Sequence, residues 1–426
     1  MAEAPPILIT GMTRSGTTWA ASMLNASGRV VYVNEPLNPR HPPGRSPGLL
    51  RADVQHRYQY ITDDNEADFR SAYGSMIGLR YHLAAELRRN HTPSDVGRAL
   101  RHQAMFLRGR AAGRRLMIAD PFAVFSAEWF ERRLGFQVVI MVRHPLAVVG
   151  SRKRLGWRFD IRELLQQPLL LRDWLIPLST RWPEALAPVD GVVHQGAQLW
   201  RLIYETALQQ QRCSPRLLLI RHEDLAVDPV AAFSNLYERL GLPFTRSSRG
   251  VVERSTAPGN PTRLDSNDPH AVRLDSRASL GSWRERLTDD EARYVETVAG
   301  PAMDRLYPEG VDGIGRAARG INDGKGFVFV SHLGEVFPSG FLPVCGGNVQ
   351  LQTLTDIYQN SDLFKALRDT SNLKGKCSVC EYRNICGGSR ARAYAMTGDM
   401  FAEEPCCTYQ PAASSRCLEE EIVQVD

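Results

Sequence analysis

Apolar residues in the N-terminal part of the chain fall into short runs, which are separated by longer stretches with helical spacing. The runs cover residues 6–10, 29–33, 137–142 and 217–220. One longer stretch places apolar residues on one helix face between Leu199 and Leu208, which is typical of core packing. Uninterrupted apolar runs that alternate with helices are typical of parallel strands buried on both faces. We therefore predict an α/β fold with a parallel sheet.

The pattern changes after residue 307. A glycine-rich stretch comes first, and two short apolar runs around Gly334 then indicate a β-hairpin. A helix is predicted over Leu354–Arg368, ahead of a group of cysteines. Since 426 residues exceed what one core usually serves, we expect a larger α/β domain and a small α+β domain, followed by a tail. The expected limits of these three parts are residues 1–312, 318–412 and 413–426.

The composition excludes few classes of protein. Charged residues make up 23% and hydrophobic residues 43%, as in ordinary globular proteins. The net charge of +5 suits an anionic ligand but is too small to indicate a nucleic-acid-binding protein. No segment has the length and apolarity of a membrane span, and residues 1–9 lack the pattern of a signal peptide. A cytoplasmic location is the expectation.

A loop rich in hydroxyl groups joins the first predicted strand to a helix. At a helix N-terminus, free backbone N–H groups and the helix dipole attract anions. A guanidinium in the same loop can bridge phosphate and sulfate oxygens. The lysine that follows the second glycine in the P-loops of NTPases is missing, so a nucleotide-hydrolysing enzyme is disfavoured. The residues predicted to bind an anion are Arg14, Ser15, Gly16, Thr17 and Thr18.

The segment Arg14–Trp19 resembles the 5'-phosphosulfate loop of the sulfotransferases that use 3'-phosphoadenosine-5'-phosphosulfate (PAPS). Arg143, at the end of a predicted strand, and Ser151, on the helix expected after it, resemble the 3'-phosphate element of that family. Residues 221–225 resemble a later segment of the family, and the whole resemblance covers about residues 6–307. It implies a P-loop-like three-layer α/β fold, PAPS as co-substrate, and Arg143 and Ser151 as further cofactor-binding residues.

Sulfuryl transfer requires a cation near the oxygen that leaves and a base for the proton of the acceptor. Arg14 is the candidate cation. Glu35 is the candidate base, because it follows the second predicted strand at the carboxyl end of the sheet and its segment resembles the Glu-Pro element of carbohydrate and bacterial sulfotransferases. Alternatively, Glu35 caps a helix or pairs with an arginine. His144 is expected to make a structural hydrogen bond.

Two loops, residues 41–63 and 158–183, are expected to shape the acceptor pocket, since acceptor pockets in this fold are built from loops. The acceptor group would be a hydroxyl or an amine of a sugar, a small molecule or a peptide. Arginines in the two loops suit a sugar or an acidic peptide, but they fit an ordinary surface equally well.

Cysteines are concentrated near the C-terminus, where seven of the eight lie between Cys345 and Cys417. A secreted protein stapled by disulfides would spread them more evenly. Three closely spaced thiols and a remote fourth can instead wrap one zinc ion or one [4Fe–4S] cluster. The four candidate ligands are Cys377, Cys380, Cys386 and Cys407.

The segments Pro338–Pro343 and Cys386–Tyr394 resemble the SPASM domain, the auxiliary-cluster module of many radical S-adenosylmethionine enzymes. The match covers about residues 320–411 and implies one [4Fe–4S] cluster on the four candidate cysteines, with Cys345 and Cys406 as alternative ligands. The C-x3-C-x2-C triplet of those enzymes is absent, so we expect no radical generation by this chain. The module could recognise a peptide, dock a partner radical enzyme or complete the fold.

The leading hypothesis is a PAPS-dependent sulfotransferase with an appended iron–sulfur module. The alternative is a peptide- or radical-enzyme-binding protein whose sulfotransferase-like domain binds nucleotide without turnover. Ala119, which stands where many family members have a lysine, favours this alternative, whereas Arg14, Arg143 and Ser151 favour an active enzyme. A nucleotide kinase is a third hypothesis, but it requires the missing P-loop lysine.

Overall fold

The computed structural model describes residues 4–39, 46–90, 92–262, 273–307, 323–324, 327–380, 383 and 386–407. It divides into two compact units, Met1–Leu306 and Tyr307–Asp426. The expected glycine-rich linker and the expected tail over residues 413–426 lie outside the described residues. Within the described part, no helix combines the length and the apolar character that crossing a membrane requires.

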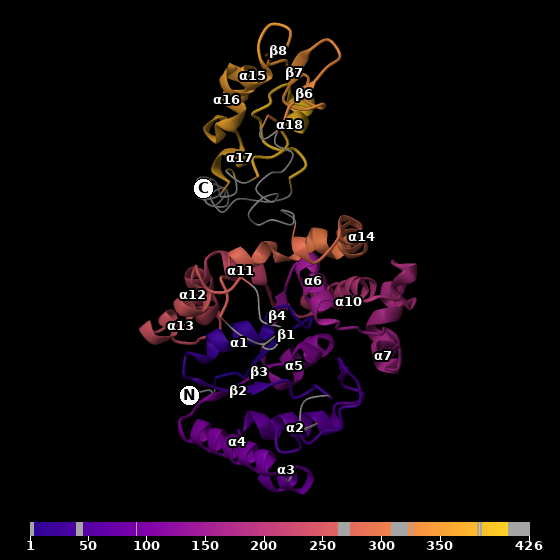
Figure 1. Ribbon diagram of the computed structural model, residues 1–426, viewed down its shortest axis with the longest axis vertical. Helices are drawn as coiled ribbons and strands as arrows, with labels where there is room; N and C mark the ends of the chain where they lie inside the picture. Colours follow the sequence, from indigo (N-terminus) through magenta and orange to yellow (C-terminus); the bar gives the residue numbers. More distant parts are fainter. Residues whose placement is uncertain are drawn as a thin grey trace, which may run out of the picture. The chain divides into compact units, whose positions relative to one another are not determined.

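The first unit is built around a parallel sheet of five strands, in the order β2–β3–β1–β4–β5 (Figure 1). The strands are β1 (Ile7–Gly11), β2 (Val30–Asn34), β3 (Arg115–Ala119), β4 (Gln137–Val142) and β5 (Leu218–Arg221). Ile9 of β1 lies opposite Ala119 of β3 and Val139 of β4. All three side chains are buried, as expected where helices cover both faces of a sheet. The predicted α/β fold with a parallel sheet is confirmed.

Helices lie on both faces of the sheet (Figure 1). On one face, α1 (Thr17–Asn25), α12 (Pro229–Arg239) and α13 (Arg246–Thr256) contribute to a common core with β1, β3 and β4. On the other face, α5 (Ala127–Leu134) packs against β4, and α10 (Val192–Cys213) packs against α5. The remaining helices of this unit are α2 (Ala67–Ile77), α3 (Leu83–Arg89), α4 (Pro93–Ala111), η1 (Pro121–Ser126), α6 (Pro145–Leu155), α7 (Arg162–Leu165), α8 (Pro168–Leu170), η2 (Leu171–Leu175), α9 (Ile176–Ser179), η3 (Pro183–Leu186), α11 (His222–Val227), η4 (Ala278–Glu285) and α14 (Asp289–Leu306).

The long helix α10 carries the predicted apolar stripe and holds the end of β4 in place. Trp200 and Tyr204 of the stripe are fully buried, which confirms their role in core packing. The indole Nε1 of Trp200 donates a hydrogen bond to the carbonyl of Arg143 over 2.8 Å, and the hydroxyl of Tyr204 donates to the carbonyl of Met141 over 2.8 Å. These two bonds position the last residues of β4, from which one of the predicted site residues emerges.

The second unit contains a small antiparallel sheet with the order β6–β7–β8. Its strands β6 (Phe329–Val330) and β7 (Glu335–Phe337) form the predicted hairpin, with Gly334 in the turn at a φ of 81°, and β8 (Gly347–Asn348) pairs with β7. The helices are α15 (Leu354–Asn360), α16 (Asp362–Arg368), η5 (Thr370–Asn372), α17 (Lys376–Val379) and α18 (Arg390–Thr397).

The prediction of a single helix over Leu354–Arg368 is wrong. The chain forms two helices, α15 and α16, because the backbone of Ser361 is extended and its hydroxyl accepts a hydrogen bond from the N–H of Phe364 at the start of α16. This is the capping role that serine prefers at helix ends. Val336, Ile357 and Phe364 form the core of this small unit.

Candidate functional site

The carboxyl ends of the five strands meet at one edge of the sheet, and each strand is followed directly by a candidate site segment. The loop after β1 contains Arg14, β2 is followed by Glu35 and β3 by Asp120. Arg143 follows β4, and His222 follows β5. In doubly wound folds, ligands bind at this edge. The fold therefore brings together side chains that are more than two hundred positions apart in sequence.

The loop between β1 and α1 depends on glycine at two positions. Gly11 has a φ of 144° and Gly16 a φ of 97°, both in the region that favours glycine. A Cβ atom on Gly11 would lie 2.4 Å from the carbonyl oxygen of Met141, and one on Gly16 would lie 2.6 Å from Nδ1 of His222. The loop is thus pressed against β4 and against the residue that follows β5. Thr17 then begins α1, so the N-terminus of that helix faces the loop.

Arg14 lies at the centre of the candidate site. Its Nε donates a hydrogen bond to Oγ of Ser151 over 3.1 Å, and Nη1 of Arg143 donates to the backbone carbonyl of Arg14 over 3.1 Å. Its guanidinium also stands 5.6 Å from the centre of the Trp157 ring. Three of the predicted site residues, on the loop, at the end of β4 and on α6, are therefore in direct contact.

Several guanidiniums crowd around this point. Burial, followed by the positive charges of Arg143, Arg154, Arg286 and Arg152 in that order of effect, lowers the pKa of Arg14 to about 10. The group still carries its charge at neutral pH. Concentrated positive charge in a partly buried site repels itself, and an anion with several charges relieves that repulsion. The electrostatics of the loop thus favour a phosphorylated or sulfated ligand.

The other loop residues are mostly buried. Ser15 is fully buried in the loop and Thr17 is 5% exposed at the first position of α1. Thr18 is partly exposed on the same helix, and its carbonyl accepts a hydrogen bond from Ser22. The structure thus gathers the five predicted loop residues around the N-terminus of one helix.

Glu35 directly follows β2 and has a positive φ of 47°. Its backbone N–H donates to the carbonyl of Ala119 over 2.8 Å, and its Oε2 accepts a hydrogen bond from the side chain of Asn38 over 2.6 Å. One of the two alternatives predicted for Glu35, an ion pair with an arginine, is not found among the described residues. Ala119, which stands in the lysine position of the family pattern, thus contributes its backbone to the position of Glu35.

Asp120 is a buried carboxyl group beside Glu35 that the sequence analysis did not select. Backbone N–H groups of Leu37 and Phe122 donate to its oxygens over 2.6 and 2.9 Å. Burial raises the pKa of Asp120 well above its usual range despite these bonds, and the charge of Glu35 raises it further. Because its pKa is raised, the arrangement favours the uncharged form of Asp120.

Backbone strain marks the same site. Among the described residues, four that are not glycine have a positive φ, namely Arg14, Glu35, Tyr58 and Leu79. Such conformations cost about 1–3 kcal/mol each and tend to be kept at functional positions. The two residues predicted to be catalytic are among the four. Tyr58 is a third, and its hydroxyl lies 3.4 Å from Oγ1 of Thr13 in the loop.

Two histidines line the site from β4 and β5. As predicted, His144 has a structural role, since its Nδ1 accepts a hydrogen bond from the N–H of Leu146 at the start of α6. Burial lowers the pKa of His144 to about 3. His222 was missed by the sequence analysis. Burial, followed by the charge of Arg143, holds its pKa well below the usual range, so its imidazole is neutral.

His222 packs against the loop between β1 and α1 and against the start of α1. Its ring lies 4.9 Å from that of Trp19 and directly against Gly16, and its Nδ1 has no hydrogen-bond partner among the described residues. A buried polar atom without a partner is uncommon in folded proteins. The signal available in the sequence was its position immediately after the apolar run of β5, in a segment that already resembled the family.

The cysteine-rich segments of the second unit come together in part. Cys377 is buried, and its sulfur accepts a hydrogen bond from the N–H of Glu404 over 3.3 Å. Nζ of Lys376 donates to the carbonyl of Cys407 over 2.6 Å, so the segments of Cys377 and Cys407 are neighbours. Cys386 is exposed. Within the described residues, no three histidine, cysteine or acidic side chains are close enough to hold a metal ion, so the four predicted ligands are not assembled there.

The donor chemistry of these cysteines nevertheless suits a cluster. Four thiols are the ligand set of a [4Fe–4S] cluster, and the backbone N–H that points at the Cys377 sulfur is a contact that stabilises a thiolate. Cys380 and Cys386 flank a segment that is described only at Arg383. Of the alternative ligands, Cys345 donates to the carbonyl of Gly347, and Cys406 is exposed beside Cys407.

Comparison with known proteins decides the family of the first unit. The model of the sulfotransferase family matches residues 5–246, more than half of the chain. The chain belongs to the sulfotransferase family. Human carbohydrate sulfotransferase 3 is 22% identical over 342 residues, which is 71% of this chain and 66% of that protein. The solved sulfotransferase STF9 from Mycobacterium avium is 15% identical, with a TM-score of 0.35 over 72% of this chain and 77% of that one.

Different relatives match the C-terminal part of this sulfotransferase-family chain. The AdoMet-dependent heme synthase of Methanosarcina barkeri is 53% identical over 93 residues, which is 22% of this chain and 27% of the synthase. The PqqA peptide cyclase of a Methylobacterium strain is 35% identical over 130 residues, 30% of this chain and 32% of the cyclase. Both are SPASM-domain enzymes, so the predicted resemblance is confirmed. The chain spans less than a third of the length of these curated relatives.

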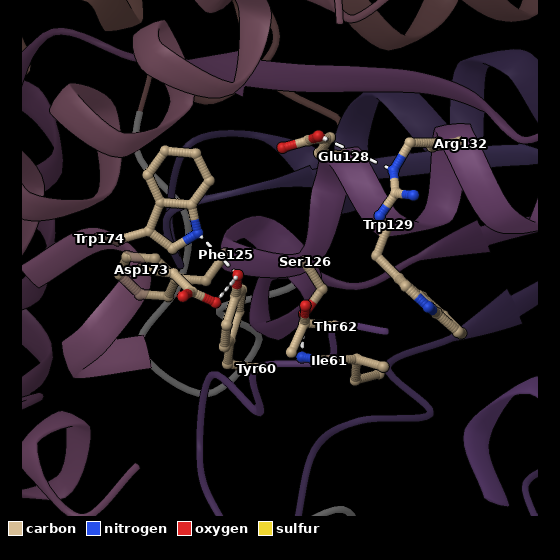
Figure 2. Close-up of a pocket in the computed structure, with 10 residues that line it drawn as sticks. All are labelled: Tyr60, Ile61, Thr62, Phe125, Ser126, Glu128, Trp129, Arg132, Asp173 and Trp174. Carbon is tan, nitrogen blue, oxygen red and sulfur yellow. Dashed lines mark hydrogen bonds and ion pairs between the residues drawn. The ribbon is translucent and has the colours of Figure 1, made fainter. Parts of the chain in front are cut away.

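The two loops predicted to shape the acceptor pocket of the sulfotransferase unit contribute to one cavity. Its volume is about 220 Å³, and residues Tyr60–Thr62 of the first loop and Asp173–Trp174 of the second line it (Figure 2). The rest of the lining comes from η1 and α5. Residues 41–45 of the first predicted loop lie outside the described part of the chain.

Proposed function

We propose that this chain transfers the sulfuryl group of PAPS to a hydroxyl or an amine of an acceptor molecule. The observation that carries the proposal is the group of guanidiniums around Arg14, which reach one helix N-terminus from the loop, from β4 and from α6. Membership of the sulfotransferase family supports it. An electropositive cluster at the carboxyl edge of a parallel sheet suits a cofactor that carries three anionic groups.

Binding of the cofactor would divide between two parts of the site. The N–H groups at the start of α1 and the hydroxyls of Ser15, Thr17 and Thr18 suit the 5'-phosphosulfate, because they converge at a helix N-terminus. Arg143 and Ser151 suit the 3'-phosphate, since they come from the end of β4 and from α6 on the other side of Arg14. The first part offers N–H and hydroxyl donors with Arg14 beside them, and the second combines a cation with a hydroxyl, so both suit phosphate oxygens.

The chemical step would use Arg14 and Glu35. PAPS supplies the sulfuryl group when it is bound. Arg14 would neutralise the charge that develops on the phosphate oxygen as its bond to sulfur breaks. Glu35 would accept the proton of the acceptor as the new oxygen–sulfur or nitrogen–sulfur bond forms. The hydrogen bond from Asn38 fixes the orientation of the Glu35 carboxylate for that role.

The first test is titration with 3'-phosphoadenosine-5'-phosphate (PAP), the product of the cofactor. We expect tight binding that Arg143→Ala weakens by about 100-fold, because a charged hydrogen bond to phosphate is lost. Arg239→Ala removes an exposed arginine of α12 and should leave the affinity unchanged. Isothermal titration calorimetry measures both.

Two outcomes would count against the proposal. Absence of PAP binding by well-folded protein would exclude a cofactor site on the loop. Tight PAP binding together with no transfer of labelled sulfate from PAPS, over a broad set of hydroxyl and amine acceptors, would favour the alternative protein that holds a nucleotide without turnover.

We further propose that the second unit holds one [4Fe–4S] cluster through Cys377, Cys380, Cys386 and Cys407. The support is the four-thiol donor set, the contact between the segments of Cys377 and Cys407, and the similarity to SPASM-domain enzymes. Recognition of a peptide by this unit is the role we favour, since one relative is named a peptide cyclase. Docking of a partner radical enzyme is the alternative role.

Purification without oxygen tests the cluster. We expect about four irons and four sulfides per chain and a broad absorbance near ~400 nm. Cys377→Ser should remove most of the iron, whereas Cys213→Ser, which changes an exposed cysteine of the first unit, should not. Circular dichroism of the Cys377 variant separates loss of iron from loss of folding. A colourless protein with one zinc per chain would contradict the iron–sulfur assignment.

A further inference from the structure

The cavity between the two predicted acceptor loops has a chemical character that the proposed function does not explain. It is lined by residues before α2, by η1 and the first turns of α5, and by the end of η2. Four of its lining residues are aromatic, namely Tyr60, Phe125, Trp129 and Trp174 (Figure 2). All of these residues belong to the first unit.

The hydrogen-bonding groups of three of these aromatic residues already have partners within the protein. Nε1 of Trp174 donates to the hydroxyl of Tyr60 over 3.0 Å, and that hydroxyl in turn donates to Oδ2 of Asp173 over 3.0 Å. Nε1 of Trp129 donates to the buried carboxylate of Glu66 over 2.8 Å. What these residues can still offer a ligand is therefore ring surface and not hydrogen-bond donors.

Glu128 supplies the cavity with a negative charge that is poorly compensated. In the view of Figure 2, its carboxylate lies between the indole of Trp174 and the side chain of Arg132. Its one ion pair among the described residues joins Oε1 to Nε of Arg132 over 3.9 Å, beyond hydrogen-bond distance. Arg132 instead donates two hydrogen bonds to Asp63, over 3.0 and 2.8 Å. The Glu128 side chain is 28% exposed, so a ligand can reach it.

The other carboxylate in the lining is already paired. Asp173 accepts hydrogen bonds from Arg172, of which the shorter is 2.5 Å, as well as the bond from Tyr60. Partial burial raises the pKa of Glu128, and the charge of Arg132 offsets only part of this, while the charges of Asp63 and Glu131 raise it further. Of the charges that line the cavity, the one on Glu128 is thus the one that a ligand would neutralise.

Ring faces attract cations, because the face of an aromatic ring is negative. An anion would be repelled by Glu128, since the charge of Arg132 in the lining is engaged by Asp63. A neutral sugar would need donors that the rings have already committed. We propose that this cavity binds the ammonium group of a small organic cation that carries a flat apolar body. The ammonium would pair with Glu128, while the body would lie against the rings of Trp174 and Tyr60.

The cavity is distinct from the cofactor loop, although side chains connect the two. The ring of Phe125 lies 5.9 Å from that of Tyr58, which is fully buried, and the hydroxyl of Tyr58 lies 3.4 Å from Oγ1 of Thr13. The proposed cation site can therefore be tested by binding alone. Its outcome does not depend on PAP binding or on sulfate transfer.

A pair of probes that differ in one group tests the proposal. We expect 2-phenylethylamine, which is a cation at pH 7, to bind the full-length protein in calorimetry at least tenfold more tightly than neutral 2-phenylethanol. Glu128→Gln keeps the size of the side chain and should lower the affinity for 2-phenylethylamine by about tenfold, since a charged hydrogen bond is lost. Glu238→Gln, which changes an exposed carboxylate of α12, should leave the affinity unchanged.

A second variant tests the aromatic wall. Trp174→Ala should also lower the affinity for 2-phenylethylamine. Trp174→Phe, which keeps a ring, should retain most of that affinity. Thermal unfolding of each variant verifies that it is folded. Equal binding of amine and alcohol, unchanged affinity in Glu128→Gln, or no binding of the amine by folded wild-type protein would each overturn the proposal.

Discussion

Replacement of Glu35 by glutamine is expected to lower the turnover of sulfate transfer by about 10²–10⁴-fold, the usual contribution of a general base. Glutamine has the same shape, and its side-chain oxygen can still accept the hydrogen bond from Asn38. The positive φ at this position strains either residue equally. What is lost is the ability to take the acceptor's proton. Initial rates with labelled PAPS measure the effect once an acceptor is known.

Two measurements make this result specific to a base. The affinity for PAP should be unchanged, because Glu35 follows β2 and the loop follows β1, with β3 between the two strands. Glu238→Gln should transfer sulfate at the wild-type rate, since its carboxylate is exposed on α12. Turnover near the wild-type level in Glu35→Gln would remove Glu35 as the base. Another group would then have to accept the proton of the acceptor.

Replacement of Arg14 by alanine should lower turnover by about 10²–10³-fold, which is typical when one group that stabilises the developing charge is removed. Arg14 donates to Ser151 and is held from the other side by Arg143, so its guanidinium is fixed in place. With a pKa of about 10, it carries its charge over the whole neutral range. Removal should also weaken PAP binding, but by less than it lowers turnover.

Backbone strain offers a control for the Arg14 result. Arg14 has a φ of 77°, a conformation that alanine also avoids but glycine accepts. If the missing charge causes the loss, Arg14→Gly should be as inactive as Arg14→Ala. Recovery of activity in the glycine variant would show that loop conformation, and not charge, is the cause. Arg246→Ala removes an exposed arginine of α13 and should leave turnover unchanged.

Much of the fold could be predicted from the pattern of apolar runs. Four of the five strands of the parallel sheet were expected, to within one or two residues at each end. The fifth, β3, was missed, because its sequence begins with Arg115 after a charged helix end. Its residues Leu116–Ala119 are buried between β1 and β2, so tertiary packing identifies the strand where the local pattern did not.

The site could be predicted only in part. The loop after β1 was found because an apolar run that leads into a glycine-containing turn is visible in sequence. The residues at the ends of β2 and β4 were found because a polar residue directly follows each apolar run. Asp120 and His222 were missed, although each directly follows a strand of the parallel sheet. What distinguishes them is burial, which raises the pKa of Asp120 and lowers that of His222. Burial of a single polar residue depends on the whole fold and leaves no local trace in the sequence.

By itself, the sequence determined the α/β class, the position of the hydroxyl-rich loop between β1 and α1 and the cysteine spacing of the second unit, because each depends on residues that are close together in the chain. Only the tertiary structure decided that Arg14, Arg143 and Ser151 touch, and that Glu128 faces a cavity with Tyr60 and Trp174. These contacts join separate strands and helices. Their geometry follows from how the elements pack, which no short stretch of sequence specifies.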